Sequence, residues 1–504
     1  MSLNAEPSVP EEREAHHLPP KSYAEAAEEA IHDASHVNGI DGAHERRAEK
    51  IANIQTNGKI KIPAEADQEQ YEGAGQDSSP KSPTVKSHRR KVSHKSNGSV
   101  DRKQNGNVEN DVYEKHENHN GQPLLSVKPP QELEDSHRKD KRSTQAQAQK
   151  KELKSGRQAG AGWQQSKIRW APMNVPLQRR LQTLAVLMHT LSIAGLLSIF
   201  FFLCTIPIFW PIILPYVIYV LFSNAGTSGE LSFRSEWARR LPVWSLFASY
   251  FPARLHRSQE LEPTRKYIFG YHPHGIISHG AFAAFATEAL GFSHLFPGIT
   301  NTLLTLDSNF RLPLYREYAL RMGLASVSRE SCENILSKGG RNGEGMGRAI
   351  TIVVGGARES LDALPGTLRL VLHKRKGFVK LAIRAGADLV PVLAFGENDM
   401  YEQLNPTEHP WIHKFQLLVK KLAGFTVPLF HARGIFNYDV GMMPYRRPIN
   451  VVVGKPIRVV QDQHPDKDYV DRVHGEYVRE LERLWHDWKD TFAKQRTEEM
   501  ELVE

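Results

Sequence analysis

The stretch YIFGYHPHGIISHGAF, residues 267–282, places three histidines close together beside a proline and glycines. His272 and His274 follow a short apolar run typical of a strand, so we expect both imidazoles at the strand's C-terminal end, where α/β folds usually build their sites. An imidazole with a pKa of about 6.5 accepts a proton readily at neutral pH. Gly275 lacks a Cβ and lets a substrate approach closely. The pattern therefore favours proton transfer by a histidine base.

Three other interpretations of these histidines stay open. The first is a metal site made of His272, His274 and His279, although no carboxylate or cysteine set completes a familiar spacing. The second is a purely structural loop. The third is a serine hydrolase, but the chain has no Gly-x-Ser-x-Gly nucleophile elbow. The two cysteines, Cys204 and Cys332, are too few for a cysteine-based zinc pattern, and a disulfide framework is not expected.

Three later stretches supply charges that suit a histidine base. They are VVGGARESL at 353–361, LHKRKGFVK at 372–380 and LVPVLAFGENDMYEQL at 389–404. Their charged side chains include Arg358, Glu359, Lys374, Arg375, Lys376, Glu397 and Asp399. A base, a carboxylate to orient it and cations to bind phosphate form a coherent catalytic set, although a basic cluster taken alone is more often a solvated face.

The elements that must position these side chains have the pattern of an α/β domain over residues 234–495. Apolar runs that suit strands covered on both faces occur at 266–271, 349–354, 389–395 and 449–453. A helical period follows KG at 376–377 and stops at Gly386. The segment from about 468 to 494 is amphipathic, so we expect it to pack one apolar stripe against the core.

A long apolar span precedes this domain. Residues 181–222 contain no Asp, Glu, Lys or Arg, which is enough for two membrane crossings with a short connection. Prolines at 207, 211 and 215 break or bend a helix, so the span predicts a kinked membrane hairpin. Cations lie on both sides of the span, which predicts that both termini face the cytosol.

The beginning of the chain has a different composition. Residues 1–160 contain three aromatic residues, Tyr23, Tyr71 and Tyr113, and neither Phe nor Trp. Such a segment buries too little apolar surface to offset the entropy of ordering it. We therefore expect a disordered polar tail over residues 1–165.

Several of these stretches also resemble a known family. YFP at 250–252, HPHG at 272–275, GGARESL at 355–361 and RKGFVKLAIRAGADLVPVLAFGEND at 375–399 are similar to the signature blocks of the type-2 diacylglycerol O-acyltransferases. NVPLQRRLQTLAVL before the apolar span resembles the fungal members. The resemblance extends from residue 168 to about 495. The same block order resembles glycerolipid acyltransferases with a His-x4-Asp motif, but here Ile277 and His279 stand where that Asp would be.

The resemblance implies a role for each candidate residue. It implies that His274 is the general base and that Glu359 replaces the missing Asp as the carboxylate that orients the imidazole. His272 would orient the loop or donate to the oxyanion, and Gly275 would lie against the substrate. The phosphates of acyl-CoA would be bound by Arg358, Lys374, Arg375 and Lys376.

The implied reaction is acylation of 1,2-diacylglycerol by acyl-CoA to triacylglycerol, the final step of storage lipid synthesis, without a metal or other cofactor. The resemblance also implies a membrane-anchored acyltransferase fold, location in the endoplasmic reticulum membrane or at lipid droplets, and no nucleic-acid partner. Two alternatives remain: an acyltransferase that uses monoacylglycerol or a long-chain alcohol, and a lipid-droplet coat protein without catalysis.

Overall fold

A computed structural model describes residues 112–118, 120–129, 170–171, 174–403, 409–423 and 428–503 of this 504-residue chain. The remainder of the tail expected to be disordered lies outside the described residues.

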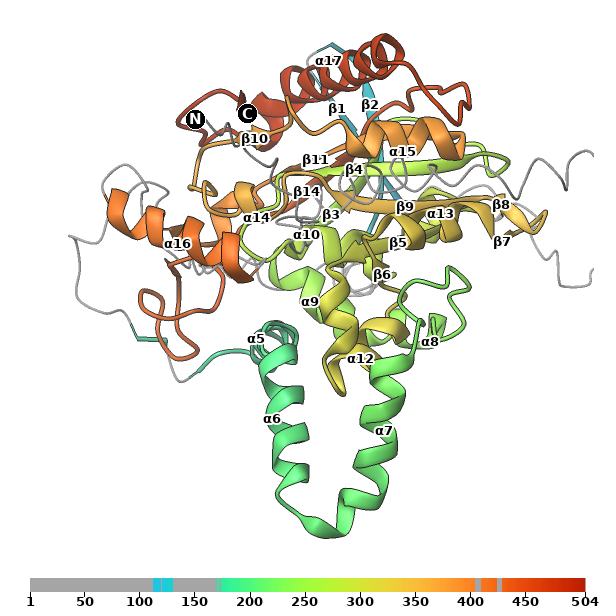
Figure 1. Cartoon of the computed structure of the whole chain (residues 1–504). Helices are drawn as coiled ribbons and strands as arrows, with labels where there is room; N and C mark the ends of the chain where they lie inside the picture. Colours follow the sequence, from blue (N-terminus) through green and yellow to red (C-terminus); the bar gives the residue numbers. More distant parts are fainter. Residues whose placement is uncertain are drawn as a thin grey trace, which may run out of the picture. The chain divides into compact units, whose positions relative to one another are not determined.

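A mixed sheet of nine strands forms the centre of the described part (Figure 1). Its order is β1-β2-β3-β14-β11-β4-β9-β5-β6, in which β1 is Tyr113–Glu117 and β2 is Pro123–Val127. The bounds are β3 Arg254–Arg257, β4 Lys266–His272, β5 Thr300–Thr305, β6 Ala325–Ser326, β9 Arg348–Val353, β11 Ala387–Phe395 and β14 Asn450–Val453. The strands from β11 to β6 are parallel to one another, whereas β14 is antiparallel to β11. The four strands expected from the sequence are confirmed, and together they place β4 near the middle of the sheet.

Helices cover both faces of this sheet (Figure 1). One face carries α13 (Arg329–Ser337), α15 (Gly377–Ala385) and α17 (Lys467–Phe492), and the other carries α9 (Pro242–Tyr250), α10 (His279–Ala281) and the π-helical turn η3 (Phe282–Ala286). Side chains alternate along β4, so Ile268 packs with the α15 and α17 cluster while Phe269 packs with the α9 cluster. The doubly covered sheet is the α/β arrangement that the apolar strands predicted.

The two helices expected downstream of the histidines are both present. Helix α15 ends at Gly386, whose φ of +62° is the left-handed conformation that glycine adopts readily. In α17, the side chain of Asp466 accepts a hydrogen bond from the main-chain N–H of Tyr469 and caps the first turn. The buried stripe of α17 is Val470, Val473, His474, Tyr477, Leu481, Leu484, Trp485 and Trp488.

The expectation of disorder is wrong for one stretch of the tail. Residues Tyr113–Glu117 and Pro123–Val127 form β1 and β2, and β2 pairs with β3 at the edge of the sheet. Leu124 is buried, and Val127 approaches Gly291 of the domain. The short apolar run PLLSV is thus ordered by an existing strand edge, which composition averaged over 160 residues does not reveal.

The apolar span forms three helices: α5 (Leu177–Thr190), α6 (Ser192–Cys204) and α7 (Trp210–Phe222). Helix α5 packs on α9, and α6 and α7 then project away from the sheet as a hairpin (Figure 1). A bend of 66° separates α5 from α6. Pro207 begins the short turn between the arms, whereas Pro215 is accommodated inside α7. The prolines thus mark the turn but do not break the second arm.

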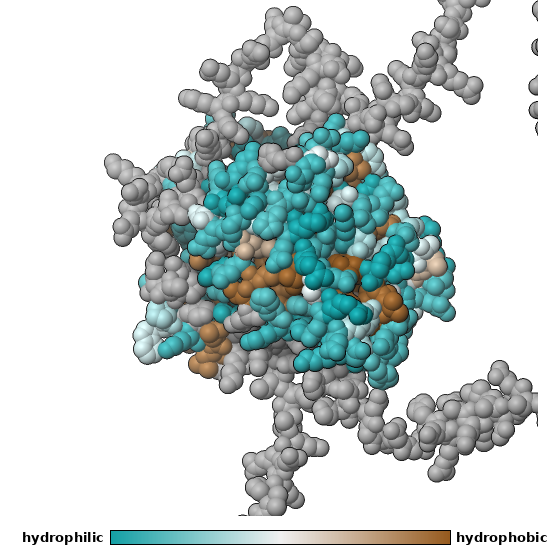
Figure 2. Space-filling model, turned by 90° about the horizontal axis from the view of Figure 1, so that it is seen from above, coloured by the Kyte–Doolittle hydropathy of each residue, from teal (hydrophilic) through white to brown (hydrophobic). Residues whose placement is uncertain are grey.

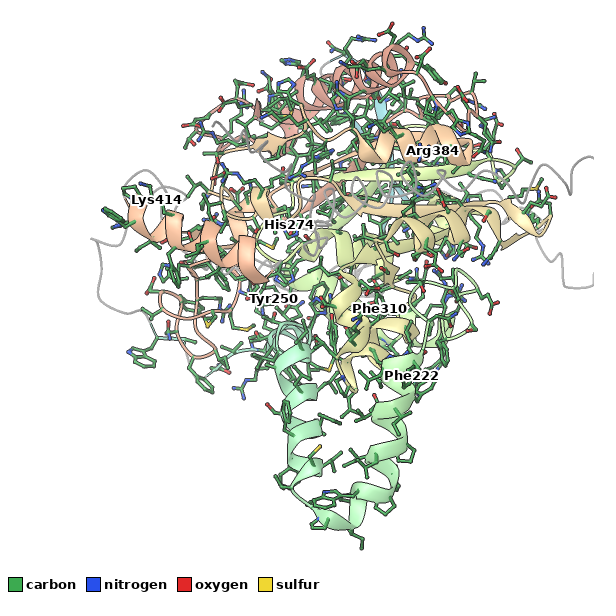
Figure 3. All side chains as sticks on the ribbon, viewed as in Figure 1. Phe222, Tyr250, His274, Phe310, Arg384 and Lys414 are labelled. Atoms are coloured by element: carbon green, nitrogen blue, oxygen red, sulfur yellow. The ribbon has the colours of Figure 1, made fainter. Side chains whose placement is uncertain are left out.

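The side chains of α6 and α7 are largely exposed (Figure 3). Large apolar residues on both arms, such as Phe201, Ile212 and Phe222, are at least 64% exposed. In the described residues, no single helix is long and apolar enough to cross a bilayer, although the bent pair of α5 and α6 passes the test of length and composition. The opposite face of the molecule is mainly hydrophilic with a narrow apolar band (Figure 2).

Candidate active site

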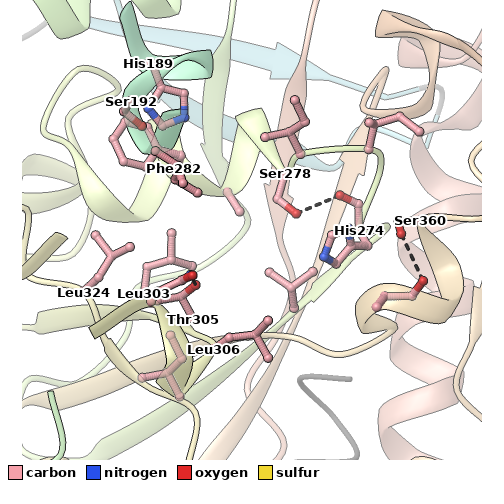
Figure 4. Close-up of a pocket in the computed structure, with 18 of the residues that line it drawn as sticks. His189, Ser192, His274, Ser278, Phe282, Leu303, Thr305, Leu306, Leu324 and Ser360 are labelled. Carbon is pink, nitrogen blue, oxygen red and sulfur yellow. Dashed lines mark hydrogen bonds between the residues drawn. The ribbon is translucent and has the colours of Figure 1, made fainter. Parts of the chain in front are cut away.

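The histidine loop begins where β4 ends. Gly275 has a φ of +61°, and a Cβ at this position would lie 2.7 Å from Cγ of Glu397. Only glycine fits this combination of left-handed backbone and close packing without strain. The hydroxyl of Ser278 donates to the carbonyl of His274 at 2.8 Å and closes the loop (Figure 4).

The imidazole of His274 is held in one tautomer by the main chain. Its Nδ1 lies 2.9 Å from the carbonyl oxygen of Gly275. Because a carbonyl oxygen only accepts, Nδ1 carries the proton and Nε2 of the neutral ring is the basic nitrogen. Burial lowers the pKa of His274, although the hydrogen bond to Gly275 acts in the opposite direction. The ring is therefore neutral at physiological pH and suited to accept a proton.

His272 occupies a different environment from the one expected. It is fully buried on the α17 side of the sheet, and its Nε2 lies 2.9 Å from the hydroxyl of Tyr477. That hydroxyl donates to the carbonyl of Gly270 at 3.0 Å, so its oxygen accepts the proton of His272. Burial lowers the pKa of His272 to about 3. This side chain joins β4 to α17, and it is not among the residues that line the cavity described below.

Glu359 lies close to the loop but does not bind the imidazole. It is 1% exposed, and no side chain among the described residues donates a hydrogen bond to its carboxylate oxygens. Burial raises its pKa well above the ordinary value, against the smaller lowering effects of the main-chain N–H of His274 and of Arg375. The expected hydrogen bond between the two side chains is therefore not formed, because the carboxyl group faces the backbone of the loop while the ring turns to Gly275.

The four cations expected to bind phosphate do not form one open group. Arg358 pairs with Asp362 at 3.5 Å, and Lys376 pairs with Asp471 of α17 at 2.6 Å. Arg375 is buried near Glu359, whereas Lys374 is exposed. Lys374, Arg375 and Lys376 are adjacent in sequence just before α15, but their side chains have separate surroundings, and Arg358 belongs to α14 (Gly356–Glu359).

Glu397 anchors the other end of the loop. It follows β11, the neighbour of β4, and is 1% exposed. Its Oε2 accepts from the hydroxyl of Tyr271 at 2.7 Å and from the main-chain N–H of Gly280 at 2.9 Å. Burial raises the pKa of Glu397 to about 7, and these donors reduce the shift. The sequence marked this acid at a strand end, but the order of the strands was needed to bring it under the histidine loop.

The third histidine of the motif has a separate partner. Nε2 of His279 lies 2.9 Å from the hydroxyl of Tyr401. The three imidazoles therefore contact three different groups. Across the part of the chain that the structure describes, no group of three His, Cys, Asp or Glu side chains is arranged to hold a metal ion.

A cavity of about 380 Å³ extends from His274 to the junction of α5 and α6 (Figure 4). His274 and Ser360 lie on one side of it, and His189 and Phe282 lie on the other. Much of the wall is apolar and includes Ile276, Ile277, Leu303, Leu304, Leu324 and Val353. Such a cavity suits an aliphatic substrate whose reactive group reaches the imidazole.

The fold and the site together define an α/β protein with a candidate histidine base beside an apolar cavity. The family model for diacylglycerol acyltransferase matches residues 200–503. The chain therefore belongs to the diacylglycerol acyltransferase family.

Its relatives include diacylglycerol O-acyltransferase 2A of Umbelopsis ramanniana, which is 49% identical over 67% of this chain and 94% of the relative. Diacylglycerol O-acyltransferase 1 of Schizosaccharomyces pombe is 47% identical over 64% of this chain and 91% of the relative. The 2-acylglycerol O-acyltransferase 1 of Bos taurus is 44% identical over 65% and 97%, respectively. Among solved structures, the 1-acyl-sn-glycerophosphate acyltransferase of Thermotoga maritima matches with 11% identity and a TM-score of 0.27, over 59% of this chain and 99% of that one.

Proposed function

We propose that this chain transfers an acyl group from acyl-CoA to the free hydroxyl of 1,2-diacylglycerol and so forms triacylglycerol and CoA. The family and the named relatives support this reaction. The structural observation that carries the proposal is the hydrogen bond from Nδ1 of His274 to Gly275, which leaves Nε2 as the proton acceptor of a residue that lines an apolar cavity.

In the proposed mechanism, Nε2 of His274 takes the proton of the acceptor hydroxyl while the hydroxyl oxygen forms a bond to the thioester carbon. The tetrahedral intermediate then loses CoA as its C–S bond breaks, and the imidazolium returns the proton to the sulfur. General base catalysis of this kind typically contributes about 10²- to 10⁴-fold. The Gly275 carbonyl stabilises the required tautomer, a role that a carboxylate has in hydrolase triads.

We further propose that α6 and α7 embed in one leaflet of the endoplasmic reticulum membrane or in a lipid-droplet surface. Each arm has 13 residues, so each is about 20 Å long at about 1.5 Å per residue. A hydrocarbon core is about 30 Å thick, so neither arm reaches across it. The chain then enters and leaves on the same side, and both termini face the cytosol. The cavity, which begins at the α5–α6 junction, lies next to the root of this hairpin and would receive its acceptor from the lipid phase.

The direct test supplies purified protein with labelled oleoyl-CoA and 1,2-dioleoylglycerol and measures triacylglycerol. The His274→Ala variant should lose turnover, whereas His294→Ala, which removes an exposed histidine, should retain it. Equal product from the wild type and His274→Ala would contradict the assignment of the base. Absence of triacylglycerol from all three would instead favour a coat protein without catalysis.

A second acceptor has specific support. The bovine relative is named a 2-acylglycerol O-acyltransferase and is nearly as similar to this chain as the fungal relatives. The same assay with 2-oleoylglycerol and with hexadecanol as acceptors would distinguish diacylglycerol from the alternatives, because the ratio of kcat/KM values measures the preference directly.

A further inference from the structure

A second cavity, of about 670 Å³, lies on another side of α5. It is bounded by the first turns of α5 and by the segment from residue 433 to residue 446, which follows β13 (Phe430–His431). Its apolar wall includes Trp170, Val175, Leu184, Leu187, Ile435 and Phe436. Four arginines complete the lining: Arg179, Arg180, Arg433 and Arg446. We refer to this site as the arginine cavity.

Arg446 is fixed at the site by neutral groups. Its guanidinium donates to Oε1 of Gln182 at 2.6 Å, to Oγ1 of Thr183 at 3.1 Å and to the carbonyl of Arg179 at 3.0 Å. It also lies over the ring of Tyr250 at 4.0 Å, and the hydroxyl of Tyr250 donates to the carbonyl of Pro444. The tyrosine of the YFP motif thus orients this arginine.

Three arginines of the cavity have no acidic side chain as a partner among the described residues. Within the described residues, Arg179, Arg433 and Arg446 form no ion pair. Asp439 is the one acid in the segment from 433 to 446, and it is buried and does not line the cavity. Arg433 is 5% exposed, so this positive charge is largely withdrawn from water.

This arrangement is unfavourable without an anion. Burial lowers the pKa of Arg446 to about 10, and the positive charges of Arg433 and Arg179 act in the same direction. A buried charge normally has an opposite charge as its partner, because desolvation is otherwise uncompensated. Guanidinium groups bind phosphate oxygens through paired N–H donors, which makes phosphate the anion that best fits several arginines.

The apolar rim indicates that the anion belongs to a lipid. Trp170 and Phe436 are 70% and 74% exposed, and the main-chain N–H of Ala171 donates to the carbonyl of Phe436 at 2.8 Å, which holds the two segments together. Leu184 of α5 extends this apolar surface toward the hairpin and is 59% exposed. Aromatic side chains beside arginines are characteristic of the level of a bilayer at which phosphate groups lie.

We propose that the arginine cavity binds the phosphate of an anionic membrane phospholipid, with Arg433 and Arg446 on the phosphate and the acyl chains against Leu184, Ile435 and Phe436. The site would fix the protein at a defined depth in an anionic lipid surface. It is separate from the cavity at His274, and its occupancy does not require acyl transfer.

The test measures the melting temperature of full-length protein, purified in nonionic detergent, during titration with dioctanoyl phosphatidic acid. A ligand that binds only the folded state raises the melting temperature as its concentration exceeds Kd. We expect a saturating rise for the wild type. Arg433→Gln and Arg446→Gln should weaken the apparent affinity by about tenfold or more, the usual effect of losing a charge-assisted hydrogen bond. Arg369→Gln removes a cation that pairs with Glu501 on β15 (Glu501–Val503), so it should bind as the wild type does.

Two further arms make the result decisive. Arg179→Gln reports on the site even if Arg446→Gln folds poorly, because the Arg179 side chain is only partly buried. Dioctanoyl phosphatidylcholine, inorganic phosphate and free CoA serve as competing probes. An equal rise in melting temperature with phosphatidylcholine, with phosphate or with CoA would overturn the assignment to an anionic lipid. The assignment would also fail if phosphatidic acid left the melting temperature unchanged, or if all three cavity variants bound it with wild-type affinity.

Discussion

Replacing Glu397 with glutamine should change how the stability of this protein depends on pH. The carboxyl group is buried and its Oε2 accepts hydrogen bonds from Tyr271 and from the main chain of Gly280. Burial raises its pKa from 4.5 to about 7, so folding binds a proton in this interval. Stabilisation by this group is complete below pH 4.5 and is lost as the pH rises to about 7.

The size of the effect follows from the shift. One pKa unit corresponds to about 1.4 kcal/mol, so raising the pKa from 4.5 to about 7 gives about 3 kcal/mol in total. Glutamine keeps an oxygen for the same donors and stays neutral at every pH. As the pH rises from 5 to 8, the free energy of unfolding of Glu397→Gln should therefore increase relative to that of the wild type by about 2–3 kcal/mol.

The assay compares thermal unfolding of the two purified proteins in the same detergent at half-unit steps of pH. The difference between their melting temperatures should grow by several degrees across this interval. Tyr271→Phe is the matched control: it removes a donor that lowers the pKa of Glu397, so the interval should move to higher pH. A difference between Glu397→Gln and the wild type that stays constant from pH 5 to pH 8 would refute the reasoning, because Glu397 would then not titrate there.

Other outcomes follow from the remaining contacts. His274→Ala should lower turnover by about 10²-fold or more. The acid limb of the wild-type pH–rate profile should lie below pH 6.5, because burial lowers the pKa of the base, and a limb above pH 7 would contradict this. Glu359→Gln should lower the rate of acyl transfer much less than His274→Ala does. Comparable losses of rate in single-turnover assays would support a catalytic pair of these two side chains, whose hydrogen bond the structure does not contain. Gly270→Ala places a Cβ against the hydroxyl of Tyr477 and should destabilise the fold by about 1–3 kcal/mol in denaturant titrations, and an unchanged midpoint would argue against this packing. Deletion of residues 1–160 should lower the melting temperature more than deletion of residues 1–111, since the longer deletion removes β1 and β2; equal values would mean that these strands add no stability.

The sequence alone was sufficient to predict those features of the fold that depend on local pattern. The apolar strands, the amphipathic α17 and the glycine that ends α15 were all expected within a few residues of their bounds, because period and turn chemistry act over short distances. The family blocks led to the correct family. The alternation of side chains along β4 is a further local signal, because His272 has the parity of Ile268 and Gly270 and so points toward α17.

Tertiary structure decided which side chains meet. Glu397 is 123 residues after His274 in chain number, yet the order of the strands brings β11 beside β4 and the acid under Gly275. Glu359 is near the loop, but the direction of its carboxyl group and its burial separate it from the imidazole. Tertiary neighbours also determine the place of β2, which is ordered by the free edge of β3. They likewise bring Arg433 and Arg446 into one cavity with α5. Pattern in the sequence reports the surroundings of a residue along the chain, whereas hydrogen bonding and desolvation depend on neighbours that only the folded chain assembles.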